Sequence, residues 1–457
     1  MFCRFAPKYL IIFSLLCVFS CADKKKEYDK TKAVSAFEII DPIKLDPALE
    51  KVAIALPKQQ QNDFWNGSSA QQNQRIENFT KDFSTKKKFF SSSREIILKD
   101  SSLFWSGFGS TKDDDFVFSP IIKDNKIYTL NAAGKLIAYD ATTQKKLWKT
   151  RVFPSLLLKN YRSPKIYLAK TDDGERIFAV AGINKIAAVS AVDGQIMWSK
   201  DISSIPVSAP VSDGNLVFVT TNDNKLYALN AKDGELQWVS SAILRNTAIL
   251  GAADPLLYKD QVIASFSSGE IYAMNKKTGE LLWSQDLNIG KANSSDFYLN
   301  DIDATPVIRG DKLYSIGNGG IMMALDLKNG NYLWKKEIAG IVDFWAAGEF
   351  LFVIDNDNKL LAVSQKTGGI KWISQLPNLK KDKKPETKFI YNGVVMMGDK
   401  LLISRTDGQL LMASPLDGGL EKTFEIGKRI YHAPVVVNGK IYFHNMGSYV
   451  VNIIEIE

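Results

Sequence analysis

Turns rich in aspartate and asparagine recur along the chain, and their side chains carry the oxygen atoms that calcium prefers as ligands. The stretch DNDNKL (Asp355 to Leu360) starts like a calcium-binding loop, but Leu360 stands where an EF-hand loop requires glycine. TNDNKL (Thr221 to Leu226) and KDNKI (Lys123 to Ile127) look like the same stretch at equivalent repeat positions. We therefore interpret all three as hairpin turns rather than as metal sites.

The residue inventory gives nucleophilic and metal chemistry little support. The three cysteines, Cys3, Cys17 and Cys21, all lie within the first 21 residues, so the rest of the chain can form no disulfide, cysteine-based zinc site or catalytic thiol. The two histidines, His432 and His444, are too few for a histidine-rich metal site, and neither has a serine and an acid nearby. Neither a G-x-S-x-G elbow nor a Walker-type loop occurs. The sequence predicts no catalytic residue, no metal and no bound cofactor.

Composition indicates a globular protein with a sizeable core. The chain has 457 residues, of which 45% are apolar and 24% charged. The net charge of +8 comes largely from runs such as KKKEYDKTK (Lys24 to Lys32) and KKDKK (Lys380 to Lys384), which are typical of solvated tails and loops. Because no basic stripe interleaved with aromatics falls on a regular element, nucleic-acid binding is not expected.

The first residues have the pattern of a targeting signal. Arg4 and Lys8 precede the apolar run YLIIFSLLCVFS, which is shorter than the roughly 20 residues that span a bilayer. We interpret residues 1–20 as a signal peptide. The following VFSC resembles the bacterial lipobox, which implies a lipidated Cys21 and a membrane anchor. An ordinary signal peptide with an incidental cysteine is the alternative. Ala22 precedes Asp23, and the resemblance then implies the outer membrane, on its periplasmic face.

Residues 21–94 are rich in polar side chains and show no sustained helical or strand period. We expect them to form a mostly extended tether between the lipidated cysteine and the folded body. One stretch within them, DFWNGSSAQQNQRIENF (Asp63 to Phe79), carries aromatic residues that a spacer does not need.

The body of the chain, residues 95–457, is built from a repeat. LYALNAKDGELQWV (Leu226 to Val239) returns as IYAMNKKTGELLWS (Ile271 to Ser284), and each unit contains four short β-type runs separated by turns. Turn pairs such as Asp233-Gly234 supply the positive φ that hairpins need. The sequence predicts an all-β fold of four-stranded antiparallel blades.

Tryptophans mark the repeat at intervals of 38 to 51 residues, which matches one propeller blade each. We expect them to pack blade against blade: Trp148, Trp198, Trp238, Trp283, Trp334 and Trp372. A seventh unit places Phe424 where tryptophan would be. An eighth unit ends without its last strand, and we expect SLFWSGF (Ser102 to Phe108) to complete it and close the ring. The prediction is therefore an eight-bladed β-propeller, with seven blades as the competitor.

The phrase YDATTQKKLW (Tyr139 to Trp148) resembles the tryptophan-docking motif of quinoprotein alcohol dehydrogenases. That resemblance implies their propeller fold and raises a pyrroloquinoline-quinone dehydrogenase as an alternative function. Many of those enzymes use a vicinal disulfide against the quinone, which this cysteine-free body cannot make. A coherent set of calcium ligands is also not visible, so we expect a scaffold and not an enzyme.

From about Phe104 onward the repeats resemble the BamB-type lipoproteins of the β-barrel assembly machinery. The likeness is strongest from Leu229 to Asn378, and the Asp63–Phe79 stretch looks like a segment of alphaproteobacterial members. The resemblance implies a propeller that docks on the periplasmic domains of the barrel-inserting channel and helps to deliver unfolded outer-membrane proteins. A generic envelope interaction module with another partner remains open.

In that family two neighbouring loops contact the channel. The first corresponds to AILRNTAILGAADP (Ala242 to Pro255), which admits two alignments, so the implied contacts are Leu244 and Arg245 or Ile249 and Leu250. The second loop implies Asp301 and Asp303, which alternatively only orient the turn before Ala304. We expect these residues to cluster on one rim of the ring: Leu244, Arg245, Ile249, Leu250, Asp301 and Asp303.

Overall fold

The computed structural model of the chain describes residues 43–68, 76–80, 94–97, 119–131, 133–143, 145–154, 164–242, 253–287, 301–380, 387–426, 429–444 and 450–454. The expected signal peptide and Cys21 lie outside these residues. The described residues are almost entirely β-structure, with one short 3-10 helix, η1 (Pro47–Leu49). None of the helices in this part of the chain is long and apolar enough to cross a membrane.

The described strands form eight four-stranded antiparallel sheets and one two-stranded ribbon. Four of the sheets follow one another in the chain: β2–β5 (Ile121–Lys123, Lys126–Leu130, Lys135–Asp140, Lys146–Arg151), β6–β9 (Pro164–Thr171, Gly174–Ala181, Lys185–Ser190, Ile196–Asp201), β10–β13 (Val211–Ser212, Leu216–Thr220, Lys225–Asn230, Leu236–Ser241) and β14–β17 (Leu256–Tyr258, Gln261–Ser265, Glu270–Asn275, Leu281–Asp286).

The remaining strands continue this pattern as far as the last sheet, which combines strands from both ends of the chain. They are β18–β21 (Val307–Arg309, Lys312–Ile316, Met322–Asp326, Tyr332–Lys336), β22–β25 (Trp345–Ala347, Phe350–Ile354, Lys359–Ser364, Ile370–Gln375), the ribbon β26–β27 (Leu379–Lys380, Thr387–Lys388), β28–β31 (Tyr391–Met397, Lys400–Arg405, Gln409–Ala413, Leu420–Glu425) and β32–β34 (Val435–Val437, Lys440–His444, Val450–Ile454) with β1 (Arg94–Ile97).

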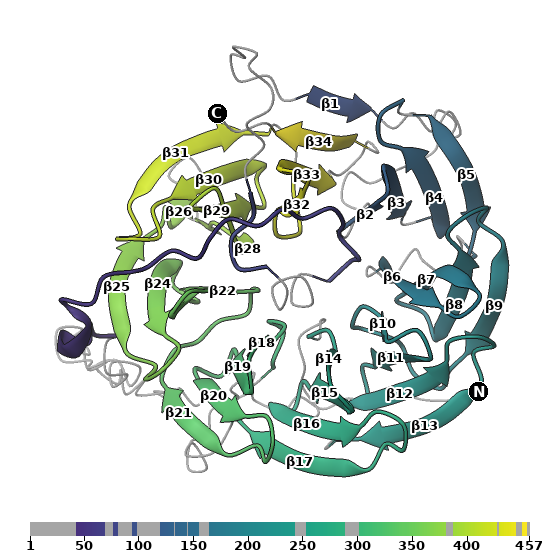
Figure 1. The fold of residues 1–457 in the computed structure, drawn as a ribbon, viewed down its shortest axis with the longest axis horizontal. Helices are drawn as coiled ribbons and strands as arrows, with labels where there is room; N and C mark the ends of the chain where they lie inside the picture. Colours follow the sequence, from purple (N-terminus) through teal and green to yellow (C-terminus); the bar gives the residue numbers. More distant parts are fainter. Residues whose placement is uncertain are drawn as a thin grey trace, which may run out of the picture. The chain divides into compact units, whose positions relative to one another are not determined.

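Within residues 43–457 the sheets stand around a common axis like the blades of a propeller, each with its first strand innermost (Figure 1). The all-β propeller architecture expected from the repeat is thus confirmed. Each second and third strand is apolar and buried on both sides, as in FLFVI of β23 and KLLAVS of β24. Such strands pack between neighbouring sheets, so the core runs around the ring.

The strand that pairs with β34 is not the expected one. β1 pairs with it in antiparallel register, Arg94 opposite Ile453 and Ile97 opposite Val450. The stretch SLFWSGF, which we expected in this place, lies outside the described residues. REII (Arg94–Ile97) is short and does not alternate between polar and apolar residues, so no strand pattern indicated its pairing with the C-terminal strand.

Each of the six tryptophans faces an alanine across the third and fourth strands of its own sheet, as in Ala228 opposite Trp238. A register shift follows each pair and turns the indole toward the next sheet. There the ring lies under a turn glycine, and a Cβ on Gly279 would come within 2.7 Å of Trp238. Trp238 Nε1 also donates to Lys276 O at 3.1 Å. The tryptophans therefore pack blade against blade.

The seventh tryptophan position is occupied by Lys422 and not by Phe424. Met412 opposes Lys422 immediately before the register shift of β30 and β31, which is the place of the alanine–tryptophan pair elsewhere. Phe424 lies two residues further along β31 and opposes Leu410. Lys422 stands four residues after Gly418, as Trp238 stands four residues after Gly234, so the spacing from the turn glycine marks Lys422 as the equivalent residue. KDNKI joins β2 to β3, whereas TNDNKL and DNDNKL join the second strand of a sheet to its third, so the three turns are not equivalent either.

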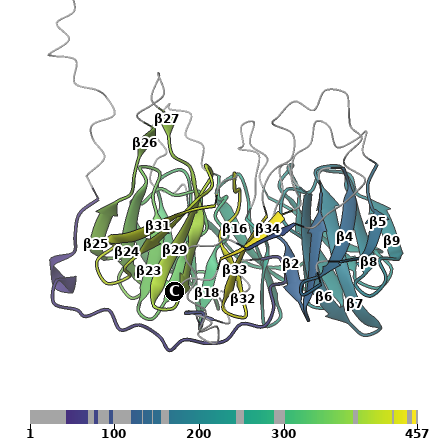
Figure 2. The same ribbon diagram turned by 90° about the horizontal axis from the view of Figure 1, so that it is seen from above.

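The N-terminal segment of the described chain lies along one face of the propeller (Figure 2). We call residues 43–68 and 76–80 the strap. Apart from η1 its backbone is extended without regular structure, in agreement with the expected tether, but several of its side chains are fully buried: Trp65, Ile76, Asn78 and Phe79. This part of the tether is bound to the propeller, because its scattered aromatic residues pack into the core.

Candidate docking site

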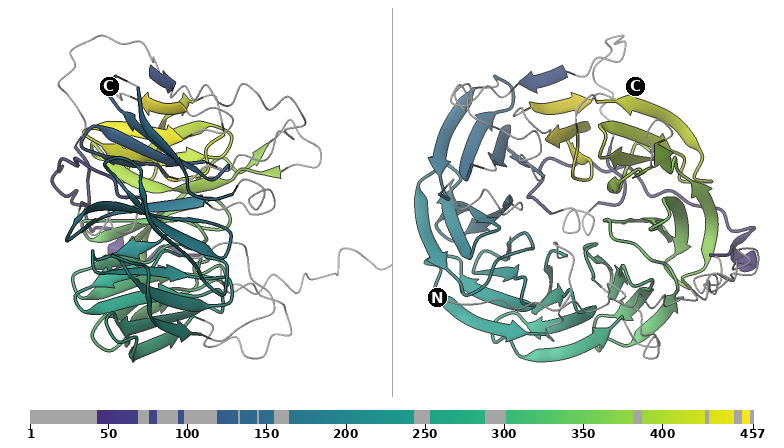
Figure 3. Two further views of the ribbon diagram at one scale, coloured as in Figure 1. Left: turned by 90° about the vertical axis from the view of Figure 1, so that its right-hand side faces the viewer. Right: turned by 180° about the vertical axis from the view of Figure 1, so that it is seen from behind.

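The two faces of the ring carry different connections. We call the side from which the ribbon β26–β27 projects the loop face, and the opposite side the strap face (Figure 2, Figure 3). The loop face carries the segments that join the outer strand of one sheet to the inner strand of the next. The strap face carries the turns between first and second strands. Long connecting segments on a rigid scaffold are where propellers place their contacts.

The two loops that the family resemblance singles out begin and end on the loop face. Leu244, Arg245, Ile249 and Leu250 lie outside the described residues. The ends of the two loops meet, because Ala253 N donates to Ile302 O at 3.3 Å and Asp254 N to Thr305 Oγ1 at 3.3 Å. The expectation that both loops belong to one face therefore has support from the backbone, while the positions of those four side chains stay a prediction.

Asp301 and Asp303 do not form the charged rim that we expected, because Asp301 is buried. Asp301 is 1% exposed, and its carbonyl accepts from Asn318 N at 3.0 Å in the next turn. Asp303 is partly buried and faces the central channel. Burial, with a smaller contribution from the Asp301 carboxylate, raises the pKa of Asp303 to about 6, against the opposing effect of Lys165. The two carboxylates are thus close enough to interact, and Asp303 carries the one that faces open space.

Asp303 lines a cavity of about 370 Å³. Other walls come from several sheets: Lys165, Asp254, Ile341, Tyr391 and His432. Trp65 and Gly67 of the strap also line it, so the strap reaches the channel axis. The cavity offers carboxylates, one lysine and apolar surface within a single recess.

Two of the carboxylates around this cavity have a structural task that the sequence did not reveal. Asp254 Oδ1 accepts from Ala209 N at 2.8 Å, and Asp343 Oδ1 accepts from Thr305 N at 2.9 Å. Each aspartate therefore caps the opening residue of the inner strand in the preceding sheet. Both aspartates stand just before the inner strand of the following sheet, 45 and 38 residues beyond the backbone that they cap, so only their recurrence at that place in the repeat could have indicated the role.

His432 takes no part in proton chemistry at neutral pH. It is 8% exposed, and burial lowers the pKa of His432 to about 4. Its Nδ1 lies 2.7 Å from Ala433 O, and Ser404 Oγ donates to its carbonyl at 2.8 Å. The neutral ring belongs to the packed wall of the channel.

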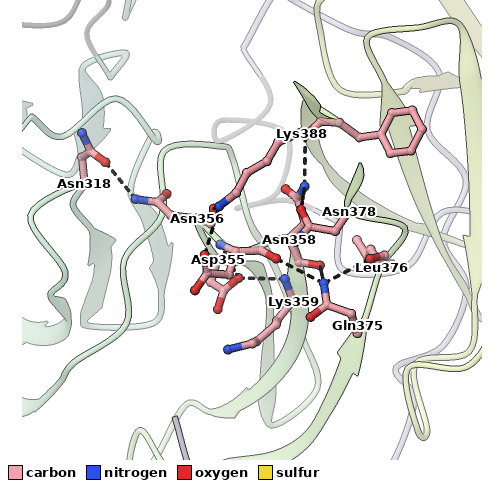
Figure 4. Close-up of polar contacts among 11 residues, drawn as sticks. Asn318, Asp355, Asn356, Asn358, Lys359, Gln375, Leu376, Asn378 and Lys388 are labelled. Atoms are coloured by element: carbon pink, nitrogen blue, oxygen red, sulfur yellow. Dashed lines mark hydrogen bonds and ion pairs between the residues drawn. The ribbon is translucent and has the colours of Figure 1, made fainter. Parts of the chain in front are cut away.

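The calcium-like stretch DNDNKL is a structural turn beside this site (Figure 4). Asp355 Oδ1 accepts from the backbone of Asp357 at 2.9 Å and of Lys359 at 2.7 Å, which closes the turn. Asn358 adopts a positive φ of 59° and its Nδ2 donates to Phe389 O at 3.0 Å. Within the described residues no group of three or more His, Cys, Asp or Glu side chains could hold a metal ion.

The same turn holds the base of the ribbon β26–β27. Asn358 Nδ2 donates to Asn378 Oδ1 at 3.0 Å, and Lys388 Nζ pairs with Asp357 at 3.1 Å (Figure 4). Ile390, just after the ribbon, is 62% exposed, and Ile341 on the neighbouring segment is 42% exposed. Apolar side chains thus stand open at the mouth of the cavity, beside a fixed polar network.

Comparison with known proteins shows what the repeat region is similar to. The family described as "PQQ_2: Outer membrane protein assembly factor BamB" matches residues 167–374. The outer membrane protein assembly factor BamB of Salmonella typhimurium is 27% identical over 332 residues, which are 71% of this chain and 83% of that protein. BamB of Yersinia pestis is 26% identical over 324 residues, 70% of this chain and 80% of that protein.

Solved structures show the same architecture. BamB from Moraxella catarrhalis superposes with a TM-score of 0.63 at 18% identity, covering 74% of this chain and 96% of that one. The quinohemoprotein alcohol dehydrogenase of Comamonas testosteroni gives 0.55 at 12% identity, covering 74% and 73%. At these identities the structures show the fold alone. In sequence the chain is thus similar to the outer membrane protein assembly factors BamB, and in fold it is similar both to BamB and to a quinohemoprotein alcohol dehydrogenase.

Proposed function

We propose that this chain is a non-enzymatic subunit of the outer-membrane β-barrel assembly complex, which docks on the periplasmic domains of the barrel-inserting channel and assists the delivery of outer-membrane proteins. The similarity to BamB proteins over about 70% of the chain favours this function over a quinoprotein dehydrogenase. The observation that carries the docking site is the junction of the two loops, where Ala253 N bonds to Ile302 O.

The proposed contact is divided between the two loops. Asp303 offers its carboxylate toward the open cavity, and the first loop supplies Leu244 and Arg245 or Ile249 and Leu250. Asp301 supports the second loop from below, because it is buried. An apolar anchor beside charged groups suits a docking patch in which charges direct the approach and apolar contacts hold the partner.

Affinity capture of the protein from solubilised envelopes tests this proposal. The unmodified chain should recover the channel subunit, and Asp303→Lys should reduce that recovery at least about tenfold, as expected when one charge pair at an interface is reversed. The matched control is Asp260→Lys, which changes an exposed aspartate on the strap face of the neighbouring sheet. Equal loss in both variants, or recovery of unrelated envelope proteins instead of the channel, would reject the proposed site or the proposed partner.

We also propose that Cys21 carries lipid and holds the protein at the periplasmic face of the outer membrane. The support is the VFSC stretch after a short apolar run. A Cys21→Ser variant should move from the membrane fraction to the soluble periplasmic fraction. A variant that stays with the membrane through the proposed partner complex would be released once the channel contact is also broken by Asp303→Lys.

The dehydrogenase alternative has a direct test. Adding pyrroloquinoline quinone with calcium to the purified chain should leave the absorbance of the quinone unchanged, because no part of the described chain gathers three acidic or histidine ligands. A shifted quinone spectrum with saturable binding would move the function to the quinoprotein class.

A further inference from the structure

The strap follows the ring across several sheets through specific backbone contacts. It starts on the outer strand β25, where Asp46 N donates to Ile370 O at 2.8 Å. Lys371 Nζ donates to the carbonyls of Leu49 at 2.7 Å and Glu50 at 2.6 Å. Three contacts on adjacent residues fix the start of the strap at the perimeter of sheet β22–β25.

The returning segment, residues 76–80, is bound to the inner strands. Glu77 Oε2 accepts from Gly348 N at 2.8 Å, and its carbonyl accepts from Trp345 Nε1 at 2.7 Å. Phe79 is fully buried, its N–H donates to Met396 O at 3.0 Å, and its carbonyl accepts from Gly398 N at 2.8 Å. This segment therefore ties sheet β22–β25 to sheet β28–β31.

The next contacts cross the place where the last sheet meets the first. Asn62 Nδ2 donates to Val436 O at 2.5 Å, and its carbonyl accepts from Asn438 N at 2.6 Å, both at the β32–β33 end. Trp65 exchanges two hydrogen bonds with Ile122 of β2, at 2.6 and 2.9 Å. Two residues of the strap, Asn62 and Trp65, thus join the C-terminal sheet to the first complete sheet.

Burial supplies most of the stability of this contact. Trp65 is 1% and Phe79 0% exposed, and both belong to the same core cluster as residues of β2, β23 and β33. Burying two large aromatic side chains removes much apolar surface from water, which offsets part of the entropy cost of ordering the extended strap.

The outer strands give an independent sign of occupancy. The residue two positions before the tryptophan is exposed in neighbouring sheets, 54% for Leu236 and 49% for Leu281. The equivalent Ile370 is 7% exposed, because the strap covers it. Sheet β22–β25 is thus the sheet whose perimeter is closed by the chain itself.

We propose that the strap face is a preformed groove for an extended peptide, and that the strap occupies it as a clasp which holds the first and last sheets of the ring together. This goes beyond the proposed docking function and does not depend on it. The groove recognises a chain with two buried aromatic anchors and asparagines that bond to turn backbone: Trp65, Phe79, Asn62 and Asn78.

The clasp has a consequence for membrane attachment, and this consequence rests on the proposed lipid at Cys21. If residues 22–93 were all free, 72 residues would separate the lipid from β1, but only 21 residues, 22–42, precede the strap. At up to roughly 3.5 Å per residue these segments reach roughly 250 Å and roughly 70 Å. Binding of the strap thus reduces the maximum distance between the lipid and the propeller to less than a third.

Cleavage of the full chain tests the clasp. A site for a specific protease is inserted between Thr80 and Arg94, outside the described residues, and the purified protein is cut and passed over a sizing column. The N-terminal fragment should stay with the propeller. In Trp65→Ala and Phe79→Ala variants it should be lost, whereas Val52→Ala, an exposed strap residue, should retain it. Separation of the fragment from a soluble, folded propeller in the unmodified sequence would overturn the proposal.

If the cut protein aggregates, hydrogen exchange measured on the uncut chain tests the clasp instead. The amides of Trp65, Phe79 and Asn438 should exchange at least about a hundredfold more slowly than unprotected amides, since each donates to a backbone carbonyl. Trp65→Ala should remove most of that protection at Asn438. Exchange of the strap amides at the unprotected rate would contradict the clasp.

Discussion

The two faces of the ring differ in what covers their backbone. On the strap face, turns such as Gly348, Gly398 and Asn438 donate their N–H groups to the strap. On the loop face Ile341 and Ile390 are exposed, and with Asp303 they line a cavity of about 370 Å³ that Trp65 and Gly67 of the strap also line. One face is thus bound by the chain itself, while the described part of the loop face leaves large apolar side chains exposed.

This difference indicates how the molecule divides its tasks. The repeats give every sheet the same turns on the strap face and the same joining segments on the loop face, so they make the sheets alike but not the two faces. The strap adds to the difference between the faces, because it covers turns of the strap face. The loop face, where the two family-implied loops meet at Ala253 and Ile302, is the surface to which we assign the proposed partner.

The largest expected effect is the loss of the strap anchor. Trp65→Ala removes a fully buried indole and should lower the free energy of unfolding by about 3–5 kcal/mol, measured by denaturant titration. Val52→Ala, at 41% exposure on the same strap, should change it by less than about 0.5 kcal/mol. Equal small effects in both variants would mean that the strap face is not closed in the way described.

The next largest effect compares one position in two sheets. Ile370→Ala, under the strap, should cost about 2–3 kcal/mol, because the side chain is 7% exposed. Leu281→Ala at the equivalent position is 49% exposed and should cost under about 1 kcal/mol. The ratio of the two values, from denaturant curves with equal slopes, measures the cover that the strap provides; a ratio near one would contradict it.

A polar contact of the strap should give a similar or smaller loss. Asn78 Nδ2 donates to Asp399 Oδ1 at 2.7 Å and to Pro57 O at 2.9 Å, so Asn78→Ala removes a donor from each, while Gln59 Nε2 still donates to Asp399 Oδ2 at 2.8 Å. We expect a loss of about 1–3 kcal/mol in the free energy of unfolding. Asn331→Ala, exposed in a turn of sheet β18–β21, is the matched control and should stay near zero.

The smallest effect concerns the loop face and depends on pH. Because the pKa of Asp303 is raised to about 6 in the folded protein, the folded state holds its proton more tightly than the unfolded state. Stability is therefore present below the unfolded pKa near 4 and is lost as pH rises through about 6. Asp303→Asn removes this loss and should stabilise the protein by about 1 kcal/mol at pH 7.5, after allowance for partial exposure, and by almost nothing at pH 4.

Thermal unfolding at the two pH values checks that prediction. A variant that is equally stabilised at pH 4 and pH 7.5 would show that the gain comes from packing and not from the buried charge. A destabilised variant at pH 7.5 would mean that the carboxylate has a favourable partner in the folded state.

The repeat could be predicted from the sequence because its signals are local. A tryptophan, a turn glycine and two apolar strands recur within one unit, and each Trp–Gly contact follows from them. The substitution of Lys422 for the seventh tryptophan was missed because the search followed aromatic residues, although Lys422 stands four residues after Gly418 as the tryptophans stand after their turn glycines.

The packing of the strap and the burial of the site residues could not be predicted from the sequence, because they depend on contacts between segments that are far apart in the chain. The Asp63–Phe79 stretch signalled by its aromatics that it was more than a spacer, but the partners of Trp65 and Phe79 lie far along the chain, in β2 and β28. For Asp303 the residue type and loop could be predicted, whereas its orientation toward the channel could not. Burial of Asp301 follows from Asn318 in the next turn, again a contact visible only in three dimensions.

Site-specific photo-crosslinking in living cells tests most directly whether the loop face is the partner surface. A photoreactive residue is placed either at Ile341, on the loop face beside Asp303, or at Val192, 74% exposed in a turn on the strap face. We predict that the barrel-inserting channel is crosslinked from Ile341 and not from Val192. Crosslinking of the channel from Val192 with none from Ile341 would contradict the assignment of docking to the loop face.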